Sequence, residues 1–112
     1  MFHNLKAGKP VNVKEVPTLA DALQGGILLD NIYTFHMCRK FLDDIMLISE
    51  EQIAESIRYA FRNKHLVLEG AGACGIALIL DKRAKEFGQR IVAICSGDNI
   101  DPDTFLDIAR MR

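Results

Sequence analysis

Residues 70–75 carry the pattern Gly-x-Gly-x-x-Gly, between an apolar run and an apolar, helix-like stretch. In dinucleotide-binding folds such glycines let a pyrophosphate approach the N-terminus of a helix, and an acidic residue about 20 positions further on binds a ribose hydroxyl. Asp98 stands at a comparable place here. The pattern alone leaves three interpretations open: a dinucleotide site, a different ligand at the same helix start, or glycines that only allow close packing.

Polar residues follow two of the apolar runs. Glu69 precedes the glycine motif and would place a carboxylate next to a pyrophosphate, which disfavours the dinucleotide. Asp98 lies inside the turn-rich loop 96–99, not directly at the end of a run. Ligands of open parallel sheets bind at the carboxyl ends of the strands. We therefore expect Glu69 and Ser96 to face one ligand; the alternative is that the Ser96 hydroxyl merely ends a turn.

Three short apolar runs predict the strands that would position these residues, at 44–48, 66–68 and 90–95. Continuous apolar runs of this length are typical of strands covered on both faces. Because helical segments separate them, the pattern predicts a partial parallel sheet with flanking helices, an α/β arrangement. A sheet of so few strands has uncovered edges, which indicates that other polypeptide completes it.

The helices are predicted from capping and breaking residues. Ser49 and Gln52 form a capping-box pattern, glycines end two of the segments, and Pro102 suits the first turn of the last one. Residues 11–13 alternate like a short strand. The predicted helical segments are 18–23, 34–41, one that begins at 49, 72–87 and 102–108.

Composition narrows the classes of function. The 14 basic and 15 acidic side chains are mixed along the chain and give a net charge of −1, which disfavours a nucleic-acid partner. Apolar runs such as 75–80 are far shorter than the ~20 residues that span a membrane, and the first residues do not resemble a signal peptide. Three dispersed cysteines, an odd number, predict buried reduced thiols in a cytoplasmic protein and no metal site.

Four motifs occur in one characteristic order and spacing. They are residues 18–23 (T-L-A-D-A-L), 33–35 (Y-T-F), 67–73 (V-L-E-G-A-G-A) and 94–101 (I-C-S-G-D-N-I-D). Together they resemble the threonine/serine dehydratases, which are fold-type II enzymes that depend on pyridoxal 5'-phosphate. Residues 25–35 are similar to the subgroup associated with ectoine and hydroxyectoine breakdown.

The resemblance implies which residues contact the cofactor. Ser96 would hydrogen-bond the pyridine nitrogen, Glu69 and Gly70 would lie beside the ring, and the Ser96-Gly97 loop and the loop around Gly26 would pass close to it. The sequence departs from many relatives at Asp98 and at Leu28, where smaller residues are common; the second departure affects the match of the loop around Gly26.

Two parts of the family's machinery are missing from these 112 residues. Neither the Ser-Phe-Lys-like motif that binds the cofactor nor the separate glycine run that holds its phosphate occurs. We therefore expect residues 1–112 to be the C-terminal part of a dehydratase catalytic domain, a fragment of the large domain without a catalytic residue of its own. The whole enzyme would remove water and ammonia from a hydroxyamino acid; the chain alone should be inactive.

The apolar surface of such a piece predicts association into a homo-oligomer through residues 27–29 or the outer face of helix 72–87. Two other functions remain open. One is a small nucleotide-binding α/β domain that uses Asp98 and three glycines of the motif, Gly70, Gly72 and Gly75. The other is a non-catalytic interaction module that pairs with a separate chain.

Overall fold

The computed structural model describes residues 1–111, which form two compact units. One unit contains Met1–Pro17 and Gln24–Leu47, and the other contains Thr18–Leu23 and the chain from Ile48 onward. All the predicted site residues except Gly26 belong to the second unit.

The first unit is built around two short helices that contact each other, α1 (Phe2–Ala7) and α2 (Tyr33–Phe41). The α2 prediction is confirmed to within one residue; the Asn31 carboxamide oxygen accepts the Phe35 N–H at 2.9 Å and so satisfies an amide of its first turn. Helix α1 was not predicted. Residues 11–13, which were predicted as a strand, form none; the Val11 N–H instead donates to the side chain of Asn4 at 2.7 Å.

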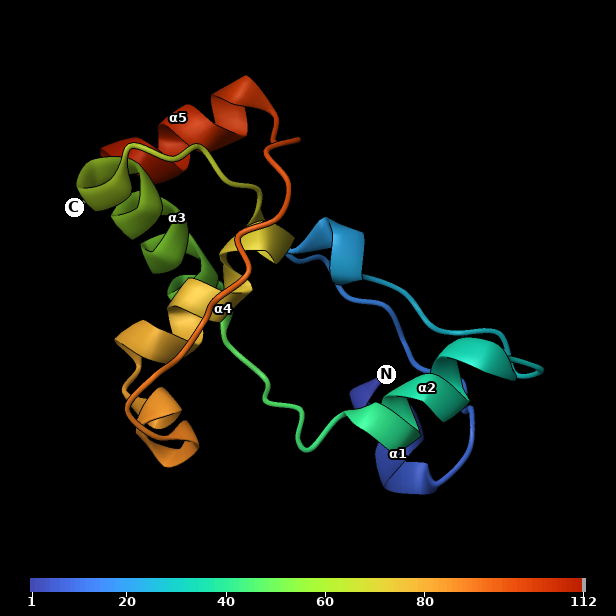
Figure 1. Ribbon diagram of the computed structural model, residues 1–112. Coiled ribbons are helices and arrows are strands. Elements are labelled where there is room, and N and C mark those ends of the chain that lie inside the picture. Colours follow the sequence, from blue (N-terminus) through green and yellow to red (C-terminus); the bar gives the residue numbers. More distant parts are fainter. Residues whose placement is uncertain (112) are drawn as a thin grey trace. The chain divides into compact units, whose positions relative to one another are not determined.

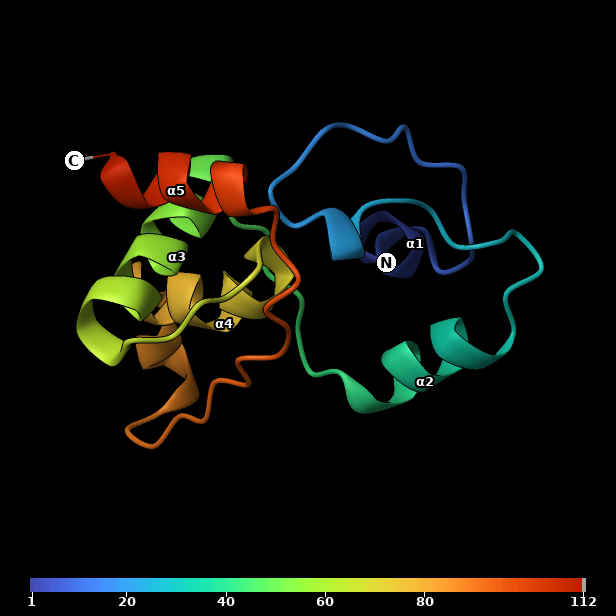
Figure 2. The ribbon, with the colours of Figure 1, turned by 90° about the horizontal axis from the view of Figure 1, so that it is seen from above.

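The second unit is a small helical core. Its elements are η1 (Asp21–Leu23), α3 (Glu50–Lys64), α4 (Gly70–Leu80), η2 (Arg83–Phe87) and α5 (Pro102–Arg110). Helix α3 packs against both α4 and α5, as Figures 1 and 2 show. The core between them consists of small and branched residues with one aromatic ring: Ala20, Ile53, Ile57, Ala60, Leu68, Ala73, Ile76, Phe105 and Ile108.

Helix α3 begins as its sequence predicts. The Ser49 hydroxyl accepts the Gln52 N–H at 3.3 Å, and the Gln52 side chain accepts the Ser49 N–H at 2.8 Å, so both halves of the capping box are present. Ile53, Ile57 and Ala60 of this helix are buried in the core, whereas Phe61, which has the same helical spacing, is 41% exposed. Helix α5 begins with Pro102 in its first turn, as predicted, and continues to Arg110.

The prediction of one helix over 72–87 is wrong. Helix α4 ends at Leu80, Lys82 takes the left-handed conformation with φ 64°, and a separate 3-10 helix follows until Gly88. The break falls where apolar residues give way to charged ones: Asp81 forms an ion pair with Arg83. A helix gains most of its stability in proteins from packing an apolar face, and residues 81–87 present little of one.

No strand is formed within residues 1–111, so the predicted three-stranded sheet is absent from the structure. Segments 66–68 and 90–95 are irregular. The residues that follow them are joined by one backbone hydrogen bond, from the Glu69 N–H to the Gly97 carbonyl oxygen at 3.2 Å. Val92 and Ile94 are 91% and 80% exposed. A ladder needs neighbouring strands, and the third predicted strand, 44–48, is divided between the two units.

None of the described helices combines the length and the apolar character that crossing a membrane requires.

Candidate functional site

Glu69 and Gly97 meet at the start of α4. Glu69 is the N-cap residue of this helix, and its N–H donates to the carbonyl oxygen of Gly97. Gly97 has a φ of 83°, and a side chain there would overlap the carboxylate of Glu69. Position 97 therefore favours glycine for its backbone conformation, and a side chain there would also require the flexible Glu69 side chain to move.

The backbone of Ser96 lies on the same helical turn. A Cβ at Gly72 would overlap the Ser96 carbonyl oxygen, so the loop can approach α4 only because residue 72 lacks a side chain. Ser96 is exposed, and its hydroxyl has no hydrogen-bond partner among residues 1–111. The structure thus brings Ser96 and Gly97 to Glu69, although no sheet edge positions them.

A third segment completes this junction. A Cβ at Gly70 would overlap the Leu19 carbonyl oxygen, and the neighbouring Ala20 is buried in the core. The Leu19 N–H donates to Glu50 Oε2 at 2.7 Å. Sequence reasoning missed Leu19 and Glu50 as parts of the site, because only the folded chain shows that residues 18–23 lie against α4.

The glycines of the motif pack against other segments of this same chain. Gly70 and Gly72 each make room for a backbone carbonyl of this same chain, and a Cβ at Gly75 would lie 3.2 Å from the Cβ of Ala93. Two carbonyl oxygens and the Glu69 carboxylate beside the first turn would repel a pyrophosphate. The geometry therefore supports close packing at these glycines and does not support the dinucleotide alternative.

Gly26 belongs to the other unit, where a Cβ would meet no heavy atom within 4 Å. Its predicted place beside the cofactor stays a prediction. The preceding Gly25 has a φ of 101°, which fits the predicted turn after residues 18–23.

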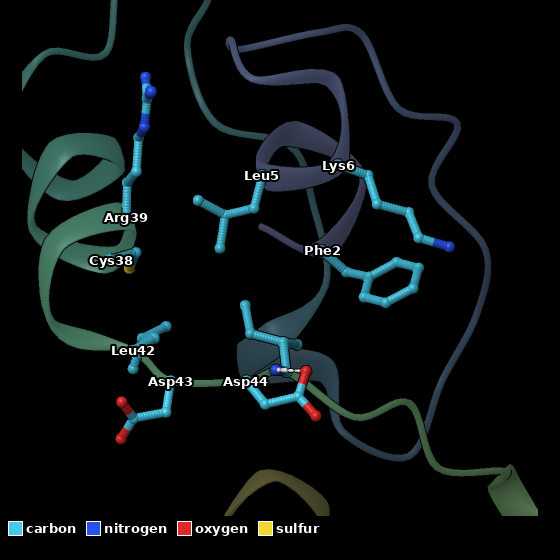
Figure 3. Close-up of a pocket in the computed structure, with 9 residues that line it drawn as sticks. Phe2, Leu5, Lys6, Cys38, Arg39, Leu42, Asp43 and Asp44 are labelled. Carbon is cyan, nitrogen blue, oxygen red and sulfur yellow. Dashed lines mark hydrogen bonds between the residues drawn. The ribbon is translucent and has the colours of Figure 1, made fainter.

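The first unit contains a cavity of about 370 Å³, shown in Figure 3. Its lining combines apolar, thiol and charged side chains: Phe2, Leu5, Lys6, Cys38, Arg39, Leu42, Asp43, Asp44 and Ile45. The Lys6 ammonium and the Arg39 guanidinium point away from the space in Figure 3, and the Lys6 Nζ lies 4.8 Å from the centre of the Phe2 ring. None of the predicted site residues lines this cavity, and its charged groups do not converge on one point.

The cysteines are free but less buried than predicted. Cys38 and Cys74 are half-buried and Cys95 is exposed, which corrects the expectation of three buried thiols. Burial raises the pKa of the Cys74 thiol, and the negative charge of Glu50 raises this pKa further. No group of three or more possible metal ligands occurs within residues 1–111.

Comparison with known proteins identifies the family to which the chain is similar. The model of a family described as pyridoxal-phosphate dependent enzymes matches residues 1–97. A Sinorhizobium fredii protein named for threonine dehydratase activity is 47% identical over 101 residues, which cover 90% of this chain and 30% of that protein. The L-threonine ammonia-lyases of Thermotoga maritima and Geobacter sulfurreducens are each 34% identical, over 90% and 91% of this chain and 24% and 25% of their own lengths. The chain thus spans less than a third of the length of these relatives.

Proposed function

The chain belongs to the family of pyridoxal-phosphate dependent enzymes, and from this premise we propose that residues 1–112 form one wall of the cofactor site of a threonine/serine dehydratase. The whole enzyme would eliminate water from a hydroxyamino acid, and hydrolysis of the resulting enamine, through its imine, would take up water and release a 2-oxo acid and ammonia. The observation that carries the proposal is the junction at the start of α4, where Glu69, Ser96 and Gly97 come together.

The residues at this junction fit one side of the cofactor ring. Ser96 offers an exposed hydroxyl without a partner among the described residues, and Gly72 leaves room for the backbone that carries it. When bound, pyridoxal phosphate supplies an electron sink that helps the β-hydroxyl of the substrate to leave. The Ser96 hydroxyl would hydrogen-bond the ring nitrogen and, being neutral, would leave this nitrogen largely unprotonated.

Glu69 and Gly70 would flank the ring. The Glu69 N–H donates to the Gly97 carbonyl, so the backbone that carries the carboxylate is held against the Ser96-Gly97 loop. None of the lysines in this unit lies in the three segments of the junction. Neither the Ser-Phe-Lys-like motif nor the separate glycine run occurs in residues 1–112, so the cofactor-binding lysine and the phosphate loop would come from other polypeptide.

The place of the chain in its enzyme is also proposed. Residues 1–112 would be the C-terminal part of the catalytic domain, in a cytoplasmic enzyme of the subgroup associated with ectoine and hydroxyectoine breakdown. The match over residues 1–97 and the small share of each relative that the chain spans support a fragment of such an enzyme. The similarity of residues 25–35 supports the subgroup.

We also propose that the isolated chain forms a homo-oligomer. Leu28 and Leu29 are 75% and 58% exposed, and clustered apolar surface of this kind marks interfaces. Sedimentation velocity at micromolar concentration should show a dimer or larger species, and Leu28→Ser with Leu29→Ser should shift it to the monomer. A stable monomer in the unchanged chain would refute this assembly.

The cofactor proposal can be tested in a chimera. The 101 matched residues of the Sinorhizobium fredii relative would be replaced by those of this chain. If the junction forms a cofactor wall, the purified chimera should show the visible absorption of bound pyridoxal phosphate, as the unmodified relative should. Ser96→Ala in the chimera should weaken binding by roughly tenfold, the value of one hydrogen bond to the ring. A folded chimera whose cofactor affinity does not change on Ser96→Ala would contradict the role of Ser96.

A further inference from the structure

Glu50 joins helix α3 to the segment that lies against the first turn of α4. It is the first residue of α3, and its carboxylate accepts the hydrogen bond from Leu19 N–H, 31 positions earlier in the chain. The capping box fixes where α3 begins and therefore where this carboxylate stands. Glu50 is not needed for that cap, because Ser49 and Gln52 make both of its hydrogen bonds.

The segment 18–23 has few other anchors. Its recorded hydrogen bonds include Ala20 N–H to the Thr18 hydroxyl at 3.1 Å and Leu23 N–H to the Ala20 carbonyl at 2.8 Å, both internal. Ala20 packs in the core, and Gly70 leaves room for the Leu19 carbonyl. Within residues 1–111, the bond to Glu50 is the one recorded hydrogen bond between this segment and α3 or α4.

The negative charge of Glu50 also acts on α4, where it raises the pKa of the Cys74 thiol. The neighbouring Glu51 differs. Hydrogen bonds from its own backbone N–H and from the Ser49 side chain lower the pKa of its carboxyl, and no hydrogen bond of Glu51 to segment 18–23 is recorded for the described residues. The two glutamates therefore share a charge and a place in the first helical turn, but only Glu50 reaches the junction.

We propose that Glu50 is a positioning residue that holds segment 18–23 against the first turn of α4 and thereby fixes Glu69 and Gly70 in the wall. This inference rests on the proposed function only where it names pyridoxal phosphate as the ligand that the wall contacts. Without the Glu50 carboxylate, Leu19 would lose its anchor, and the two residues that pack on Gly70, Leu19 and Ala20, would move relative to α4.

The test uses amide hydrogen exchange of the 112-residue chain, resolved by NMR. In Glu50→Ala, the Leu19 amide should exchange about fivefold faster than in the unchanged chain, as expected for loss of one hydrogen bond. Glu50→Gln keeps an acceptor oxygen and should restore most of the protection. Glu51→Ala removes the same charge from the same helical turn and should leave Leu19 unchanged.

A second readout shows whether the loss of the Glu50 carboxylate also moves the first turn of α4, or only affects the Leu19 amide. The backbone amide signals of Gly70 and Gly97 should shift in Glu50→Ala and return in Glu50→Gln, whereas that of Ile108 in α5 should stay in place. Unchanged Leu19 exchange in Glu50→Ala, or altered exchange with Gly70 and Gly97 unmoved, would overturn the inference.

The outcome does not depend on the alanine variant alone. If Glu50→Ala does not fold, Glu50→Gln should still move the Leu19 amide proton signal upfield, because its acceptor is no longer charged, and Glu51→Gln should not; an unmoved signal would overturn the inference. Both readouts are made without cofactor. A chimera that fails to bind pyridoxal phosphate would therefore refute the proposed function and leave the role of Glu50 standing.

Discussion

Gly72→Ala should lower the free energy of unfolding by about 2 kcal/mol, against the trend for helices. Alanine is favoured over glycine in a helix interior by about 1 kcal/mol, so propensity alone predicts a gain. The structure predicts a loss, because the new Cβ would overlap the carbonyl oxygen of Ser96. Backbone cannot yield as a flexible side chain does, so either α4 or the 96–97 loop must move.

Gly75→Ala is the matched control, since it adds the same methyl group to the same helix. Its Cβ would lie 3.2 Å from the Cβ of Ala93, a contact that a shift of a few tenths of an ångström relieves. Urea denaturation followed by circular dichroism should show this variant close to the unchanged chain or more stable by up to about 1 kcal/mol. Gly72→Ala more stable than the unchanged chain would show that the loop does not pack on α4.

The 112-residue chain alone, with pyridoxal phosphate added, should form no 2-oxo acid from serine or threonine above the rate of free cofactor. Enzymes accelerate reactions by roughly 10⁶-fold or more, and the missing lysine is the group that would bind the cofactor for that chemistry. A coupled assay of 2-oxo acid formation checks this, with the Sinorhizobium fredii relative as the positive control. Turnover by the isolated chain would show that one of its own lysines replaces the missing one.

Local features of the fold could be predicted because their causes are local. The Ser49–Gln52 cap and the start of α5 at Pro102 each depend on residues within two turns. The length of α4 could not be predicted in this way, because the apolar pattern does not show that Lys82 adopts a left-handed conformation. Helix α1 has six residues and no side-chain cap, so its sequence gave little signal.

The absence of the predicted sheet could not be foreseen from the local apolar pattern. The run 90–95 has the composition of a strand covered on both faces, yet Val92 and Ile94 are exposed in the structure. Strand pairing depends on partners distant in sequence, and the relatives are more than three times as long as the part that this chain matches. The α/β architecture implied by the family thus stays a prediction for these residues.

The candidate site could be predicted in part. Glu69 and Ser96 were selected because both follow apolar runs, and the structure does bring their backbones to the same turn of α4. The close approach itself comes from Gly70, Gly72 and Gly97, whose need for space is visible only once the opposing backbone is in place. For the same reason, Glu50 could not be recognised from its spacing.

The most direct test of the account is turnover by the chimera that carries this chain in the Sinorhizobium fredii relative. If the chain supplies a wall of a dehydratase site, the chimera should form a 2-oxo acid and ammonia in equal amounts from threonine or serine. Ser96→Ala should then lower kcat/KM by at least about tenfold, because the ring nitrogen loses its hydrogen-bond partner. A folded chimera that binds pyridoxal phosphate but forms no 2-oxo acid, beside an active unmodified relative, would contradict the account.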